Sequence, residues 1–218
     1  MWKSLWLIAW RDRLAFSIVL LVSDRSPLSS ALGLHNVFGM DELQRQVANL
    51  RALGEQPPTP ERRAEMLSAL QSKFEGIQSV ALDVLGRWGG PESSEVLRAF
   101  LQEAFVREAG WAIRGVAVRN LIPLVSAADA AWVLDLYFGL PDVLTKHELV
   151  RLVIALPPAA ARTRLVGELR SPDRLNRQAA VKAIGNMSYP DRRELLRPLR
   201  EDPDRFVRKS ARLLSQEA

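Results

Sequence analysis

The chain has 218 residues, a net charge of +5, 48% hydrophobic and 25% charged residues, and no cysteine. These proportions are typical of a folded globular protein and exclude a disordered, collagen-like or polytopic membrane chain. Without cysteine the chain has no disulfide, no thiolate zinc or iron–sulfur site and no cysteine nucleophile. Its length predicts one domain with a hydrophobic core of its own.

The N-terminal residues are the most apolar part of the chain. Their uncharged run from Leu14 to Ser23 has ten residues, fewer than the roughly 18 that a membrane-spanning helix needs. Three interpretations stay open: a helix that caps the domain, a membrane-surface helix within residues 1–22, and a secretory signal within residues 1–31. We expect residues 1–39 to form a separate apolar segment and residues 40–218 the folded domain. A retained segment fits a cytoplasmic protein, and a signal fits an exported one.

Residues 172–180 and 203–211 are two copies of one motif, 31 residues apart in the chain. The first reads PDRLNRQAA and the second PDRFVRKSA, so five of the nine positions are identical. Self-similarity at such a period is typical of stacked helical repeats. The repeat therefore predicts helix starts and ends with the same spacing along the chain.

Helix signals extend this period towards the N-terminus. First helices are predicted to start near residues 60, 92, 127, 158 and 191. Second helices are predicted at residues 74–88, 109–122, 145–156, 173–187 and 204–216. The starts depend on signals such as Thr59 before Pro60, and helix ends are predicted at Gly54, Gly89 and Gly139. The last helix carries a predicted apolar stripe of Phe206, Ser210, Leu213 and Leu214.

Two four-residue motifs mark further helix starts. They run from Ser126 to Asp129 and from Thr145 to Glu148, and only the second has the residue types of a strict capping box. No alternating strand pattern competes with the helices. Short helix pairs cannot bury their apolar stripes alone. We therefore predict an all-α protein, a right-handed α-solenoid of about five stacked helical hairpins with an atypical N-terminal capping segment.

The sequence ELLRPLREDPDRFVRKSA, residues 194–211, resembles a HEAT repeat of the short kind found in phycobilin lyase-like proteins. It has the mid-helix proline, the Asp-Pro-Asp turn and the Val-Arg pair. The resemblance covers residues 60–216 and is weaker in residues 77–81 and 113–117. It implies an armadillo-like helical fold that presents a curved surface to a partner. Some proteins of this kind attach or detach bilin chromophores, and nothing in this sequence selects that chemistry.

Basic residues concentrate towards the C-terminus. Residues 111–218 hold 18 Lys and Arg against 12 Asp and Glu, whereas residues 1–110 hold 12 against 13. The basic C-terminal third is a candidate surface for an acidic protein or for nucleic acid. The candidate binding residues are Arg174, Arg177, Lys182, Arg205, Arg208, Lys209 and Arg212. The last helix of a solenoid needs a polar outer face, so these residues also fit a soluble C-terminal cap.

Arg114, Arg177 and Arg208 occupy equivalent repeat positions and form a predicted ladder along the stack. The ladder has either a structural role or a ligand-binding role. Asp173 and Asp204 lie four residues before two of these arginines, a spacing that predicts ion pairs within one helix.

Trp88, Trp111 and Trp132 fit either the core between repeats or a groove for a partner. His35 and His147 are remote from each other and lack a metal-ligand pattern. There is no Gly-rich phosphate loop, and no residue stands out as a nucleophile. We therefore predict no catalytic residue, metal, cofactor or small-molecule substrate, and leave enzyme activity open.

The predicted function is a non-enzymatic HEAT-repeat scaffold that binds a protein partner on its concave or basic surface. The alternative is a DNA-binding or DNA-repair protein resembling the HEAT-like alkylpurine DNA glycosylases. Those enzymes need an acidic residue beside aromatic side chains, whereas Trp111–Gly115 offers a Trp with no carboxylate after it. The alternative is therefore binding to DNA without catalysis.

Overall fold

A computed structural model describes residues 35–216, and within that range the regular elements are helices with no strand. The chain divides into two compact units, residues 1–45 and 46–218. Helix α2 (His35–Gly54) spans this division, and its residues from Gln46 onward belong to the second unit. The predicted signal and membrane-surface segments lie outside the described residues, and the predicted boundary after residue 39 stays a prediction.

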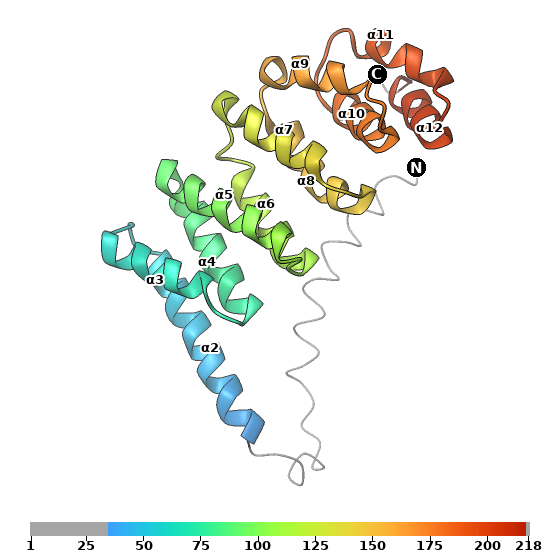
Figure 1. Ribbon diagram of the computed structural model, residues 1–218. Coiled ribbons are helices and arrows are strands. Elements are labelled where there is room, and N and C mark those ends of the chain that lie inside the picture. Colours follow the sequence, from blue (N-terminus) through green and yellow to red (C-terminus); the bar gives the residue numbers. More distant parts are fainter. Residues whose placement is uncertain (1–34, 217–218) are drawn as a thin grey trace, which may run out of the picture. The chain divides into compact units, whose positions relative to one another are not determined.

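Pairs of helices repeat along the second unit (Figure 1). In chain order they are α3 (Pro60–Leu70) with α4 (Glu75–Trp88), α5 (Gly90–Val106) with α6 (Trp111–Leu121), α7 (Ala130–Gly139) with α8 (Val143–Ala155), α9 (Pro158–Glu168) with α10 (Arg174–Asn186), and α11 (Arg192–Leu196) with α12 (Arg205–Leu214). A 3₁₀ turn, η1 (Ala127–Asp129), precedes α7, and another, η2 (Arg197–Glu201), continues α11. The predicted hairpins and their starting points are confirmed.

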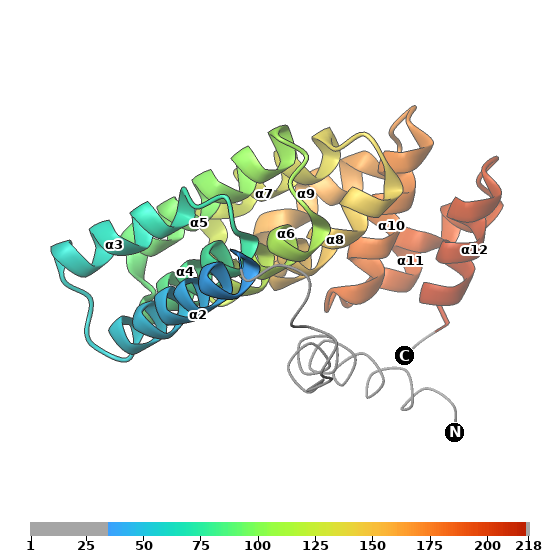
Figure 2. The same cartoon turned by 90° about the horizontal axis from the view of Figure 1, so that it is seen from below.

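The first and second helices of the hairpins form two layers. Figure 2 shows α3, α5, α7 and α9 in one row, with α4, α6, α8 and α10 beside them in a second row. The second helices α4, α6, α8, α10 and α12 contact one another in succession. Large apolar side chains fill the space between the layers, among them Leu82, Leu97, Leu121, Leu149 and Leu165, each fully buried. The architecture is the predicted all-α stack of repeats.

Local capping explains where the helices begin. The Thr59 side chain accepts a hydrogen bond from the Arg62 N–H at the start of α3, as predicted. Ser126 and Asp129 form a reciprocal capping box. The predicted box at Thr145 is wrong, because α8 begins earlier and the Asp142 carboxylate accepts from the Thr145 N–H. A side-chain acceptor just before the helix satisfies N–H groups that lack a partner in the first turn.

Close approach of second helices requires glycine at one position in α10. A Cβ added to Gly185 would lie 2.6 Å from Cδ1 and 2.7 Å from Cβ of Leu214 in α12. The predicted apolar stripe of α12 is partly wrong, because Phe206 and Leu213 are 44% and 54% exposed. This helix buries Val207 and Ala211 instead. Between residues 35 and 216 no helix is both long and apolar enough to cross a membrane.

Candidate functional site

One polar side chain in each hairpin binds backbone carbonyl groups between the last turn of the first helix and the start of the second. It always stands four residues after the N-cap of the second helix. The three arginines of the predicted ladder are among these side chains, and two further residues join them. From here on the ladder means all five: Gln78, Arg114, Lys146, Arg177 and Arg208.

The donors of the ladder differ, and their acceptors are carbonyls between the last turn of the first helix and the N-cap of the second. Gln78 Nε2 donates to the carbonyls of Leu70 and Ser72, at 3.1 and 2.7 Å. Lys146 Nζ donates to the carbonyls of Tyr137 and Phe138, at 3.0 and 2.8 Å. Carbonyls at a helix end lack partners within the helix. Gln78 and Lys146 therefore fasten their second helices to the end of their own first helices, whereas the arginines of the ladder bind the turn that connects the two helices.

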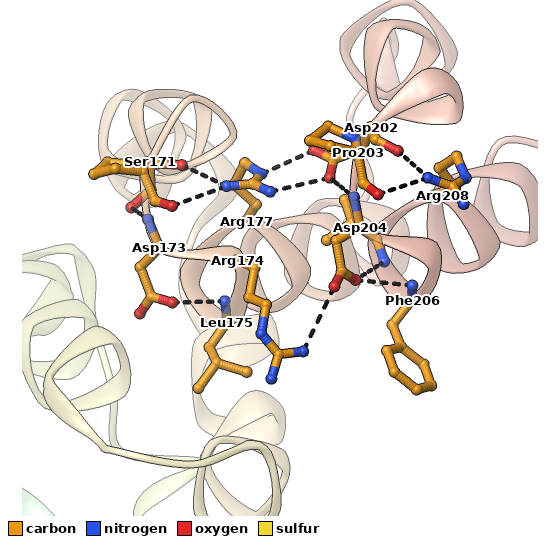
Figure 3. A network of polar contacts seen from close by, with 12 residues as sticks. Ser171, Asp173, Arg174, Leu175, Arg177, Asp202, Pro203, Asp204, Phe206 and Arg208 are labelled. Atoms are coloured by element: carbon orange, nitrogen blue, oxygen red, sulfur yellow. Dashed lines mark hydrogen bonds and ion pairs between the residues drawn. The ribbon is translucent and has the colours of Figure 1, made fainter.

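Arg114 and Arg177 extend from their own hairpins to the next one. Nε and Nη2 of Arg114 donate to the two carboxylate oxygens of Glu148, at 2.8 and 2.9 Å. The same atoms of Arg177 donate to the two carboxylate oxygens of Asp202, at 2.8 and 3.0 Å (Figure 3). Such two-point contacts between a guanidinium and a carboxylate are strong and directional. The arrangement supports the structural interpretation of the ladder.

The predicted pairing of Asp173 with Arg177, and of Asp204 with Arg208, is wrong. The Asp173 side chain instead accepts from the Leu175 N–H and caps α10. Asp204 accepts from backbone N–H groups at the start of α12. Both carboxylates sit at the N-cap, where they satisfy N–H groups that the helix itself leaves unpaired.

Burial and hydrogen bonding act against each other on Asp202. Its side chain is 4% exposed and that of Arg177 is 14% exposed. Burial favours the neutral acid, but hydrogen bonds from Arg177 and from the Asp204 N–H outweigh it and lower the pKa of Asp202. Lys146 is 4% exposed, and burial lowers the pKa of its ammonium group.

The predicted binding residues fall into two groups. Several are engaged within the protein: Arg177 with Asp202, Arg208 with backbone carbonyls, Arg174 with Asp204 at 3.5 Å, and Arg212 with Glu201 at 3.3 Å and with the Arg200 carbonyl. Lys182 is half-buried, and Arg205 and Lys209 are exposed. Their role in binding a partner stays a prediction.

Exposed apolar side chains gather where the second helices start, a feature that the sequence analysis missed. Phe74, Trp111, Leu144 and Phe206 are 47%, 60%, 78% and 44% exposed, and Leu175 is half-buried. We call these five residues the start edge. A recurring apolar residue two places after the N-cap, as at Leu144, Leu175 and Phe206, is the signal in the sequence.

The starts of the second helices are neighbours all along this edge. A Cβ added to Gly110, before α6, would lie 2.7 Å from Oε1 of Glu75 in α4. The contact between Arg114 and Glu148 joins α6 to α8. Val143 at the start of α8 and Leu175 at the start of α10 line one small cavity together with residues further along α7, α8 and α10, and Arg174 pairs with Asp204 between α10 and α12. The apolar residues therefore follow one continuous edge of the stack.

The three predicted tryptophans lie in different surroundings. Trp111 belongs to the start edge, whereas Trp88 and Trp132 are half-buried. The guanidinium of Arg63 lies 5.8 Å from the Trp88 ring centre, and that of Arg98 lies 4.7 Å from the Trp132 ring centre. Both distances are within the range of cation–π contacts. In the described part of the chain, no group of three His, Asp or Glu is placed to hold a metal ion.

Comparison with known proteins agrees with the repeat geometry. Residues 130–215 match the family model of HEAT repeats. A search of the curated proteins finds no match. The matched range contains the hairpins from α7 to α12, in which helix pairs, capping aspartates and ladder arginines recur. Residues 130–215 are therefore similar to HEAT repeats, and the stacked helix pairs of the described chain fit that similarity.

Proposed function

We propose that the protein is a scaffold that binds a protein partner along the start edge. The observation that carries this proposal is the row of exposed apolar side chains, in which Leu144 is 78% and Trp111 is 60% exposed. Exposed apolar groups in a row, rimmed by polar residues, mark surfaces that other proteins cover. Aromatic anchors such as Trp dominate the energy of many protein interfaces.

The helical framework makes this edge suitable for binding. Each edge residue lies in or beside the first turn of a second helix, and the ladder holds the start of that helix within its own hairpin, as Lys146 does through the carbonyls of α7. A surface whose backbone is already ordered loses less conformational entropy when a partner binds. Repeats that stack side by side present equivalent positions at regular intervals, which suits an extended partner.

The test compares a variant that loses apolar surface on the start edge with a control variant that loses exposed apolar surface elsewhere. Trp111→Ser combined with Leu144→Ser removes the two most exposed edge residues, and Leu67→Ser changes a 44% exposed leucine of α3 in the other layer. We call the Trp111→Ser and Leu144→Ser combination the edge variant. A partner is a protein that the wild type and the Leu67 variant capture from lysate and the edge variant does not. Each such protein is then purified, and its binding to all three is titrated. We expect at least about tenfold weaker binding by the edge variant, the loss typical of a central anchor.

Two outcomes would contradict the proposal. One is equal binding of a purified partner by the edge variant and the wild type. The other is binding to a short DNA duplex that weakens steeply between about 50 and 200 mM salt, since displaced counterions give phosphate contacts that dependence. The second outcome would favour the nucleic-acid function.

A further inference from the structure

Two arginines of α10 hold the turn that precedes α12. Arg177 binds both carboxylate oxygens of Asp202, at 2.8 and 3.0 Å. Arg174 pairs with the carboxylate of Asp204 at 3.5 Å. The Asp202–Asp204 turn is thus recognised by two cations placed three residues apart on one helix (Figure 3).

The same two cations recur at the end of the stack. Thirty-one residues after Arg174 and Arg177 come Arg205 and Arg208, in the first turn of α12. Nη1 of Arg208 donates to the carbonyls of Asp202 and Pro203, at 2.5 and 2.8 Å, as Nη1 of Arg177 does to its own turn. Figure 3 shows Arg208 on the far side of this turn from Arg177.

The acidic partners do not recur with the cations. In Arg114 and Arg177 the Nε and Nη2 atoms hold a carboxylate of the next hairpin. Among residues 35–216, Nε and Nη2 of Arg208 have no carboxylate partner, and neither does the guanidinium of Arg205. The Nε and Nη2 edge, which binds a carboxylate in Arg114 and Arg177, therefore has no carboxylate partner in Arg208 among the described residues.

The outer face of α12 suits a polar partner. Val181 and Gly185 of α10 are buried, whereas the residues 31 positions later, Arg212 and Gln216, are exposed. A further hairpin packed through apolar side chains would need apolar residues at those two positions. Charge complementarity at this face therefore points to an acidic segment.

We propose that Arg205 and Arg208 bind an Asp-x-Asp turn of an acidic partner protein, in the way that Arg174 and Arg177 bind Asp202 and Asp204. This proposal rests on the proposed protein-binding function and adds a second surface with a defined partner chemistry. A guanidinium can donate two parallel hydrogen bonds to the two oxygens of a carboxylate. Arg114 does so with Glu148, and Arg177 does so with Asp202. Two cations also match the two charges of such a turn.

The experiment is a titration of the full chain with a short peptide that contains Glu-Asp-Pro-Asp, followed by nuclear magnetic resonance. The Nε–Hε signal of Arg208 is assigned by its absence in Arg208→Lys, which keeps the charge and loses the two-point geometry. We expect this signal to shift when the peptide binds. The affinity for the peptide should fall at least about fivefold in Arg208→Lys and in Arg208→Gln, because each variant loses at least one charged hydrogen bond. A peptide with Gln-Asn-Pro-Asn should cause no shift.

The control is Arg193→Gln, which removes one charge from the neighbouring helix α11 at an exposed position outside the candidate binding residues. Its affinity should stay within about twofold of the wild type, since an exposed charge outside the contact contributes little. Thermal melts identify any variant that fails to fold, and the edge variant of Trp111 and Leu144 should bind the peptide normally. That last result separates this proposal from the start edge.

Three results would overturn the proposal: no peptide binding at low salt, an equal loss in the Arg193 and Arg208 variants, and tighter binding of a DNA duplex through Arg208. The third would assign the two arginines to phosphate.

Discussion

Replacing Asp202 by Asn tests the strongest link between two hairpins. Asp202 accepts two hydrogen bonds from Arg177 and one from the Asp204 N–H, and its side chain is 4% exposed. Asn keeps one acceptor oxygen, so the variant loses one charged hydrogen bond and leaves the half-buried guanidinium without its counter-ion. We expect the free energy of unfolding to fall by about 2–4 kcal/mol. This range combines about 1.5–3 kcal/mol for the lost charged hydrogen bond with the penalty for leaving a buried charge unpaired.

The assay is urea denaturation followed by circular dichroism, with hydrogen exchange of the α12 amides to locate the loss. The control is Asp191→Asn, whose partner Arg162 and own side chain are 40% and 34% exposed. Solvent screens that pair, so its loss should be smaller. Equal losses in both variants, or a change below about 1 kcal/mol in the Asp202 variant, would refute the reasoning.

The pH dependence of the same variant gives a second check. The folded-state pKa of Asp202 lies below its unfolded value, because the Arg177 and backbone hydrogen bonds outweigh burial. A lowered carboxylate pKa stabilises the fold above the unfolded pKa, and this contribution is lost as pH falls through the folded pKa. The stability difference between wild type and Asp202→Asn should therefore be full at pH 7 and shrink below about pH 4.

Gly185→Ala should destabilise the contact of α10 with α12 by about 1–3 kcal/mol, because its Cβ would meet Leu214 at 2.6 Å. Gly167→Ala in α9 is the matched control, because a Cβ added at Gly167 would have nothing within 4 Å. The higher helix propensity of alanine should therefore stabilise the protein by about 0.5–1 kcal/mol. Thermal melts that rank these two variants in the opposite order would contradict the packing argument. Tyr137→Phe should cost about 1 kcal/mol, since the buried hydroxyl donates to the Ala179 carbonyl at 3.0 Å. Urea midpoints equal to the wild type would show that this bond adds no net stability.

The hairpins could be predicted from the sequence because their signals are local. Thr59 before Pro60 determines a helix start with no help from the rest of the fold. The same holds for the aspartate that precedes α12, where residues 202–204 read Asp-Pro-Asp. Signals within one turn of helix depend on few atoms, so they survive without tertiary information.

The partners of the ladder could not be predicted in the same way. An Asp four residues before an Arg fits a pair within the helix as well as a cap, and side-chain orientation decides between them. Gln78 and Lys146 share a position and a function with Arg177 but not a residue type. Their equivalence is visible only in the structure, where each side chain binds carbonyl groups between the last turn of the first helix and the start of the second. The apolar residues of the start edge follow the helix period, and burial alone separates them from core residues such as Val207.

The chemistry of each ladder residue determines how firmly neighbouring hairpins are coupled. A guanidinium has enough donors to bind its own hairpin and the next one, so Arg114 and Arg177 join successive hairpins. Among the described residues, Lys146 has no carboxylate within ion-pair distance in the following hairpin. In a linear array, cooperativity depends on the contacts between nearest neighbours. The contact between α8 and α10 should therefore be among the first to open under denaturant, since there, as after Gln78, no ladder arginine of the described chain joins the two hairpins.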